Sequence, residues 1–208
     1  MTISLLIDEP HNAVASMTVL LAHGAGAPMD SEFMQSMTEC LATAGMRIAR
    51  FEFPYMADRR QDGRKRPPNP MPRLLDAFRE AAALLEGPLV LAGKSMGGRV
   101  ASMLADELNA HAAICFGYPF HPPGKPDKTR VAHLPQMRTP TLILQGTRDP
   151  LGKPEEVTGY PLAKCVRVEW LESGDHDFKP LKASGLTQYG LIEQAAAAAV
   201  RFCRAPSG

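Results

Sequence analysis

The stretch LVLAGKSMGGRV, residues 89–100, predicts an apolar strand, a glycine-bounded turn and the start of a helix. Within it, Gly93, Ser95 and Gly97 form a G-x-S-x-G motif in the turn between strand and helix. Such a turn holds the serine in a strained backbone conformation and projects its hydroxyl above the sheet, at a helix N-terminus that favours negative charge. A bare match to the motif is common by chance, but the strand–turn–helix context makes it specific. Ser95 is therefore the candidate nucleophile.

Short apolar runs alternate with helical patterns on both sides of this motif. Several runs lack polar alternation, which is typical of strands covered on both faces, and alternation of strands and helices predicts parallel pairing with right-handed crossovers. The sequence thus predicts one α/β domain over residues 1–208, with a mostly parallel sheet of about seven strands, helices on both faces and no cap domain. The expected strands are 3–7 at an edge, 18–24, 46–53, 88–93, 111–117, 139–146 and 165–171, and the expected helices are 30–44, 72–86, 97–109 and 186–204.

Length and composition narrow the class of protein. A chain of 208 residues is long enough to bury a core in one domain, and 45% hydrophobic with 22% charged residues is typical of a globular protein. These values exclude a disordered chain, a collagen-like repeat and a coiled coil. A formal net charge of +1 creates no global field toward nucleic acid or anionic lipid, so neither partner is expected.

The first residues and the cysteines indicate the cellular compartment in which the protein is expected. The start MTISLLIDEPHN lacks a basic region, Asp8 and Glu9 interrupt its short apolar run, and no stretch approaches the ~18 apolar residues of a membrane span. We therefore expect a cytoplasmic protein without a signal peptide. Buried free thiols, rather than disulfides or metal ligands, are expected for the four scattered cysteines Cys40, Cys115, Cys165 and Cys203.

A serine nucleophile requires a base that takes its proton and an acid that holds the base. In the fold that the motif indicates, these partners follow the serine in the order acid, then histidine. Of six histidines only His176, in ESGDHDF after the last expected strand, lies late enough. Asp149 in GTRDP follows strand 139–146 at a carboxyl edge, and Asp127 is the rival acid. The predicted catalytic residues are Ser95, Asp149 and His176.

An oxyanion hole requires two backbone N–H groups near the serine. Met96, directly after the serine, is expected to supply one of them. The other is expected from Ala25, in the loop HGAG after the first central strand. His23 of this loop is a candidate substrate-binding group, and its alternative role is to shape the loop through hydrogen bonds of its imidazole.

Two long segments, 56–73 and 118–135, follow expected strands and are predicted to be irregular. Open α/β folds place their sites at this edge of the sheet, and loops of such length are usually functional or disordered. His121 in the second segment is a further candidate substrate-binding residue.

Within the first segment, the loop 58–73 holds six basic residues against two acidic ones. Arg59 and Arg66 are candidate substrate-binding residues that would select an anionic substrate. The alternative is a solvated loop kept extended by its four prolines. The loop lacks interleaved aromatic residues, which argues against nucleic-acid binding.

A phosphate-binding loop is the alternative interpretation of Gly93-Lys94-Ser95. It requires G-x-x-x-x-G-K-[ST], but position 88 is proline and the intervening PLVLA is an expected strand. Nucleotide binding is therefore not expected.

The motifs HGAG, GKSMGG, GTRDP and GDHDF together make the chain resemble a compact α/β-hydrolase, closest to small bacterial members of the dienelactone-hydrolase-like clan. More narrowly, FEFPYM, RKRPP, GYPFHPPGKP and GTRDPLG resemble the group that includes the hydrolase-like domain of non-specific lethal complex subunit three. The resemblance implies an eight-stranded sheet trimmed at its N-terminal end, and a triad at Ser95, Asp149 and His176. The elbow carries serine where dienelactone hydrolases carry cysteine, so dienelactone hydrolysis is not the expected reaction.

The expected function is hydrolysis of a small carboxylic ester or related acyl compound through an acyl-enzyme, with no metal and no organic cofactor. Thioesterase and amidase chemistry use the same parts. The alternative is a hydrolase-like binding or scaffold protein with little or no turnover. Without a cap, the site is expected to be shallow and to suit a small acyl group. The oligomeric state and the natural substrate stay open.

Overall fold

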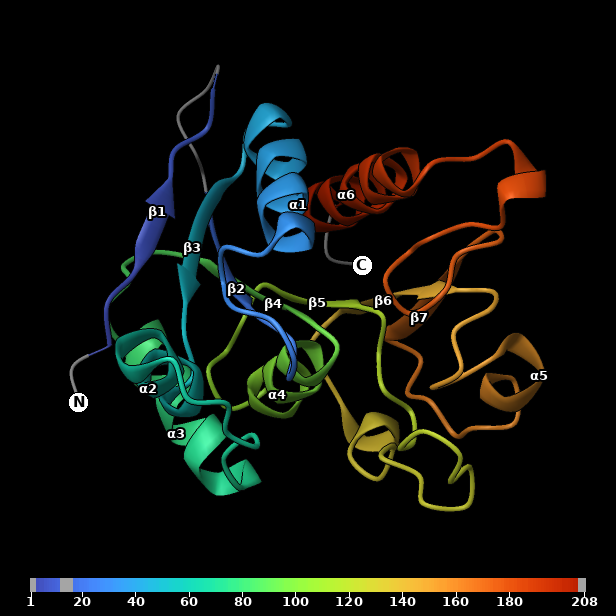
Figure 1. The fold of residues 1–208 in the computed structure, drawn as a ribbon, viewed down its shortest axis with the longest axis horizontal. Coiled ribbons are helices and arrows are strands. Elements are labelled where there is room, and N and C mark those ends of the chain that lie inside the picture. Colours follow the sequence, from blue (N-terminus) through green and yellow to red (C-terminus); the bar gives the residue numbers. More distant parts are fainter. Residues whose placement is uncertain (1–2, 12–16, 206–208) are drawn as a thin grey trace.

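A sheet of seven strands forms the middle of the molecule, in the order β1-β3-β2-β4-β5-β6-β7 (Figure 1). The structure is a computed structural model that describes residues 3–11 and 17–205. β1 pairs antiparallel with β3, and every other pair of neighbouring strands is parallel. The predicted sheet is thus confirmed. Its strands are β1 (Leu6–Asp8), β2 (Thr18–Ala22), β3 (Arg47–Phe51), β4 (Leu89–Lys94), β5 (Ala112–Phe116), β6 (Thr141–Gly146) and β7 (Val166–Leu171).

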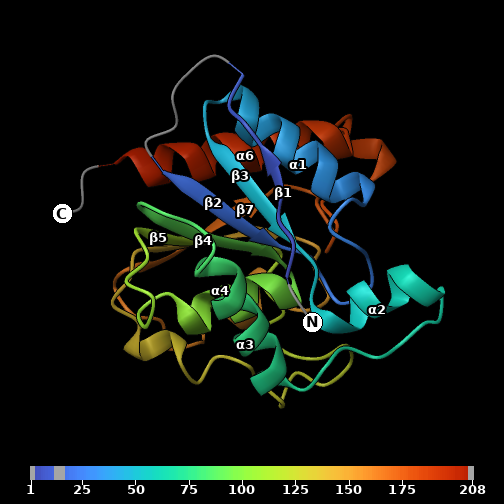
Figure 2. The same ribbon diagram turned by 90° about the vertical axis from the view of Figure 1, so that its left-hand side faces the viewer.

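Helices cover both faces of this sheet, as predicted. α1 and α6 lie on one face, and α3 and α4 lie on the other (Figure 2). No inserted cap domain separates the elements within the residues that the structure describes. The helices are α1 (Glu32–Thr43), α2 (Pro54–Asp62), α3 (Met71–Ala82), α4 (Met96–Leu104), α5 (Pro154–Val157) and α6 (Gln188–Arg204), and short 3₁₀ turns occupy Leu134–Gln136 and Lys182–Ser184.

Strand β2 shows why the central runs lack polar alternation. All five of its residues are buried. Val19 and Leu21 pack in the cluster that α1 and α6 cover, whereas Leu20 and Ala22 pack in the cluster that α3 and α4 cover. A strand with helices on both sides needs apolar residues at every position, because neither face meets water.

The expectation that segment 56–73 is irregular was wrong for its first part, because α2 covers that part and α3 begins near its end. Pro54 stands at the first helical turn, where its fixed φ and missing N–H are tolerated. Tyr55 and Met56 are buried and attach the helix to the core, and Gly63 ends it at a φ of 74°. Segment 118–135 contains no α-helix or strand, as expected for that stretch.

Glycines let α4 begin directly against β4. A Cβ atom on Gly93 would lie 2.3 Å from the carbonyl carbon of Gly97, which is backbone and cannot turn aside. We therefore expect Gly93→Ala to lower the free energy of unfolding by about 2 kcal/mol or more. Chemical denaturation measures this, with Gly26→Ala as the control, since a Cβ there meets nothing within 4 Å. Equal midpoints for the two variants would contradict the expectation.

Candidate active site

Ser95 lies in the turn between β4 and α4, with a φ of 52° and a ψ of −116°. A positive φ is costly for a residue with a side chain and persists only where the surroundings enforce it. Here the Ser95 N–H donates to the carbonyl oxygen of Phe116 on β5, 2.9 Å away. The side chain lines a cavity of about 410 Å³ together with residues of the 24–27 loop and His176.

A continuous chain of hydrogen bonds runs from Ser95 into the interior. His176 Nε2 lies 2.8 Å from Ser95 Oγ, and its Nδ1 lies 2.8 Å from Asp149 Oδ2. Because a carboxylate only accepts hydrogen bonds, Nδ1 carries the ring proton and Nε2 presents a lone pair to the serine hydroxyl. The structure thus brings together the three residues that the sequence selected as nucleophile, acid and base.

Asp149 is fully buried and each of its oxygens has a fixed partner. Oδ1 accepts from the Leu151 N–H at 2.8 Å, and Oδ2 accepts from Gln145 Nε2 at 2.9 Å as well as from His176. The rival acid Asp127 is exposed on segment 118–135. Sequence reasoning missed Gln145, although a polar residue at the end of the apolar run TLILQG was a usable signal.

The loop that follows β2 lies beside Ser95, and Gly24 and Ala25 line the cavity with it. His23 is fully buried, so it shapes this loop and does not reach the cavity as a substrate-binding group. Its Nδ1 lies 2.7 Å from the Gly24 oxygen, and its Nε2 accepts the Phe53 N–H at 3.1 Å. Burial lowers the pKa of His23, consistent with a neutral ring that donates once and accepts once.

Tyr55 is a second support of this loop, which the sequence analysis missed. Its buried hydroxyl donates to the Ala25 oxygen at 2.9 Å and lies 3.3 Å from the Gly24 oxygen. Burial also raises the pKa of Tyr55, which keeps its hydroxyl protonated and able to donate. Met96, the other predicted oxyanion donor, is the first residue of α4, where N–H groups have no acceptor within the helix.

Arg59 and Arg66, predicted as substrate-binding residues, do not line the cavity at Ser95. The Arg66 guanidinium donates to the carboxylate of Asp62 on the preceding turn of chain, with Nη1 and Oδ1 2.7 Å apart. Arg59 is half-buried on α2. Neither residue is therefore placed to contact a substrate bound beside the serine.

His121 is also absent from that cavity, and its side chain is almost fully buried. Its Nδ1 lies 2.9 Å from the Pro122 oxygen, and its Nε2 lies 3.5 Å from Glu156 Oε2 on α5. His121 thus connects segment 118–135 to α5 instead of facing the serine.

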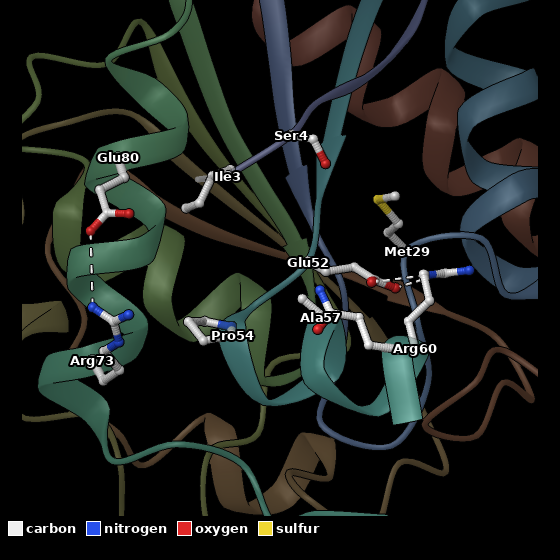
Figure 3. A pocket seen from close by; sticks show the side chains of 10 residues that line it. Ile3, Ser4, Met29, Glu52, Pro54, Ala57, Arg60, Arg73 and Glu80 are labelled. Atoms are coloured by element: carbon white, nitrogen blue, oxygen red, sulfur yellow. Dashed lines mark hydrogen bonds and ion pairs between the residues drawn. The ribbon is translucent and has the colours of Figure 1, made fainter. Parts of the chain in front are cut away.

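Other arginines of the basic region line a separate cavity of about 190 Å³ (Figure 3). Arg60 donates to both oxygens of the buried Glu52, at 2.6 and 2.9 Å, and to Asp30 at 2.8 Å, and this contact lowers the pKa of Asp30. Arg73 lies 4.0 Å from Glu80 on the same helix, α3, at one side of this cavity (Figure 3). Both arginines thus face carboxylates of the protein itself, which gives no support for selection of an anionic substrate by the basic loop.

Ser102 of α4 and His133 form a second serine–histidine pair. Ser102 Oγ donates to the Arg99 oxygen at 2.8 Å and lies 2.9 Å from His133 Nε2. Since the serine proton is already used, this nitrogen donates to the serine and does not act as its base. Burial, aided by the nearby Arg99 charge, lowers the pKa of His133 to about 4. Ser102 also lies inside the helix, away from any strained turn.

The part of the chain that the structure describes shows neither a membrane-spanning helix nor a cluster of metal ligands. In residues 3–11 and 17–205, no helix has the length and apolar character needed to cross a membrane. The same residues contain no cluster of three or more histidine, cysteine, aspartate or glutamate side chains arranged to hold a metal ion. All four cysteines are free thiols, with Cys115 and Cys203 buried and Cys40 and Cys165 partly buried.

Comparison with known proteins identifies the family of the chain and solved structures with a similar fold. A family model described as "Alpha/beta hydrolase domain" matches residues 15–204. Among solved structures, a dienelactone hydrolase from Anabaena variabilis is 22% identical with a TM-score of 0.74, over 96% of this chain and 90% of that one. A serine hydrolase without a lid from Xanthomonas campestris is 18% identical with a TM-score of 0.73, over 99% and 91%. An α/β serine hydrolase homologue from Coxiella burnetii is 19% identical with a TM-score of 0.72, over 96% and 90%.

Proposed function

The chain belongs to the α/β hydrolase family, and from that premise we propose that it is a serine hydrolase that cleaves a small carboxylic ester or a related acyl compound. The observation that carries the proposal is the hydrogen-bond chain from Ser95 through His176 to the buried Asp149, with 2.8 Å at each link. It begins at a strained turn that opens into a cavity, which is where such chemistry requires a nucleophile.

The proposed reaction has two halves, and His176 acts as base and then as acid in each of them. His176 Nε2 takes the proton of Ser95 Oγ as this oxygen bonds to the acyl carbon, and the N–H groups of Ala25 and Met96 stabilise the oxyanion. The imidazolium then gives the proton to the leaving group, which departs from the acyl-enzyme. Water, deprotonated by His176, attacks the acyl carbon. The imidazolium then returns the proton to Ser95 Oγ as the bond between this oxygen and the acyl carbon breaks, which releases the acid. Asp149 holds the ring and stabilises its positive form.

The size and the walls of the cavity favour a substrate with a small or flexible acyl group. Its volume of about 410 Å³ includes the space above Ser95, and Phe33 and Met34 of α1 supply apolar walls. A narrower placement, in the group related to the hydrolase-like domain of non-specific lethal complex subunit three, belongs to the same proposal and rests on sequence motifs such as FEFPYM and GYPFHPPGKP. Ester, thioester and amide cleavage share this machinery, and we propose an ester.

The experiment that tests the proposal is intact mass measurement after treatment with a fluorophosphonate. We expect one adduct on the wild-type protein and on Ser102→Ala, and none on Ser95→Ala. A panel of acetyl, butyryl and octanoyl esters, with matching thioesters and anilides, then identifies the reaction class. A folded wild-type protein that forms no adduct and cleaves nothing would favour the binding or scaffold alternative.

Tyr55→Phe offers a test of the oxyanion loop. The variant keeps the buried ring but loses the hydrogen bond to the Ala25 oxygen, so the loop holds its N–H group less firmly. We expect kcat for an ester to fall about tenfold with KM nearly unchanged, a fraction of the loss that follows removal of a whole oxyanion donor. The matched control is Tyr118→Phe, whose buried hydroxyl donates to the Arg130 oxygen. Equal losses in the two variants would contradict a specific role for Tyr55.

A further inference from the structure

Lys94 is the last residue of β4 and directly precedes Ser95, yet the proposed chemistry gives it no task. Its side chain is only 8% exposed, and it lines the same cavity as Ser95 and His176. A buried ammonium is unfavourable unless partners replace its lost water. The partners of Lys94 therefore indicate what it does.

The Lys94 ammonium is held by the turn that carries His176. Nζ donates to the main-chain oxygen of His176 at 2.7 Å, lies 3.3 Å from Asp177 Oδ1 and stands 5.3 Å from the centre of the Phe33 ring. Burial lowers the pKa of Lys94, and the nearby carboxylate of Asp177 opposes that effect. The shortest of these contacts is the one with the histidine main chain.

The backbone at Gly117 lies close to the contact between Lys94 and His176. Gly117, at the end of β5, has a φ of +69°. A Cβ atom there would lie 3.0 Å from the His176 oxygen and 3.3 Å from Lys94 Nζ. A side chain at this position would therefore crowd the contact between the lysine and the histidine carbonyl.

The turn itself is closed by its own hydrogen bonds. Asp175 Oδ1 accepts the N–H groups of Asp177 and Lys179, and the Asp175 N–H donates to the Lys179 oxygen. Because these hydrogen bonds make the turn rigid, one contact at its centre fixes the position of the His176 imidazole relative to Ser95. The Lys94 contact joins that centre to the end of β4, directly before Ser95.

We propose that Lys94 is a positioning residue, whose ammonium holds the His176 turn at the place where Nε2 of the imidazole meets Ser95 Oγ. This inference rests on the proposed function. The contact that positions the turn is the one with the His176 carbonyl, which belongs to the histidine itself and lies 2.7 Å from Nζ. The Asp177 side chain is 56% exposed, and its carboxylate supplies charge that offsets the burial of the ammonium.

The first test compares Lys94→Met with Asp177→Asn. We expect Lys94→Met to lower kcat and the rate of fluorophosphonate labelling about 50-fold with KM within about twofold, since small displacements of catalytic groups cost up to about 100-fold. Asp177→Asn should stay within about threefold of wild type in both rates. Thermal unfolding checks that both variants fold.

The second test restores the charge from solution. Propylammonium should raise the labelling rate of Lys94→Ala at least about fivefold, a modest fraction of the ~50-fold loss, by re-forming the bond to the His176 carbonyl, whereas propan-1-ol should not. Equal rescue by both additives would mean that volume matters and not the ammonium. A loss that appears in KM alone would make Lys94 a substrate-binding residue. Either result overturns the inference.

A third readout does not depend on turnover. The Nδ1 proton of His176, bound to Asp149, gives a downfield NMR resonance that is identified by its loss in His176→Ala. We expect it to broaden or to exchange faster in Lys94→Met, and an unchanged resonance overturns the role of Lys94. Failure of the wild-type protein to react with any acyl compound or fluorophosphonate overturns the proposed function instead, so the two failures are distinguishable.

Discussion

Replacing His176 by alanine is expected to lower kcat for an ester by about a million-fold, with little change in KM, since loss of the base from such a triad costs nearly as much as loss of the whole triad. In the proposed reaction His176 Nε2 accepts the Ser95 proton, and the two atoms lie 2.8 Å apart. KM is expected to stay nearly unchanged because the proposed task of the ring is proton transfer and not binding of the acyl group. Steady-state kinetics with purified protein measure both constants, and fluorophosphonate labelling should slow in parallel.

The matched control for this variant is His133→Ala, which breaks the other serine–histidine hydrogen bond. We expect kcat to stay within about twofold of wild type, because distant sites act independently. His133 donates to Ser102, whose own proton is used by the Arg99 oxygen 2.8 Å away. A larger loss in His133→Ala than in His176→Ala would mean that the wrong serine has been assigned.

Asp149→Asn is expected to lower kcat about ten-thousand-fold while the protein stays folded, as removal of the acid's charge does in serine triads. The amide has the shape of the carboxylate but donates through one of its atoms. It therefore favours the ring tautomer that carries its proton on Nε2, which cannot accept from Ser95. Steady-state kinetics measure the loss, and thermal unfolding verifies the fold.

The control for this prediction is Asp127→Asn, which alters the rival acid on segment 118–135. Asp127 is exposed, so its replacement should leave kcat and the melting temperature nearly unchanged. Comparable losses from the two variants would refute the assignment of Asp149 as the residue that orients His176.

The sequence predicted the sheet because its central strands are short apolar runs bounded by turn residues. β2, for example, is buried at all five positions, and its residues are apolar apart from one threonine. Two helices escaped prediction. α5 spans four residues, too few for a helical period, and α2 is attached through only two buried side chains, Tyr55 and Met56. Charged residues dominate the rest of α2 and conceal its pattern.

The candidate triad was predictable because chain order and one turn motif restrict each role to one or two residues. The residues that position the triad and the oxyanion loop were not predictable, because folding brings them together from distant parts of the chain. Lys94 and the His176 oxygen are 82 positions apart, and the Tyr55 hydroxyl lies 30 positions from its Ala25 acceptor. The sequence also did not show that His23 and His121 would be buried away from the site. Their residue type suggested a site, but both rings are buried and bonded to neighbouring main chain.

The parallel order of the sheet has a consequence for how the protein acquires its reactivity during folding. The loop with Ala25, the Ser95 turn, Asp149 and the His176 turn follow β2, β4, β6 and β7, so the site spans most of the width of the sheet. Contacts between segments so far apart in sequence form late and slowly. We therefore expect a partly folded chain in which β6 and β7 have not docked to lack the reactive serine of the proposed site. Reactivity toward a fluorophosphonate would then follow the docking of these strands.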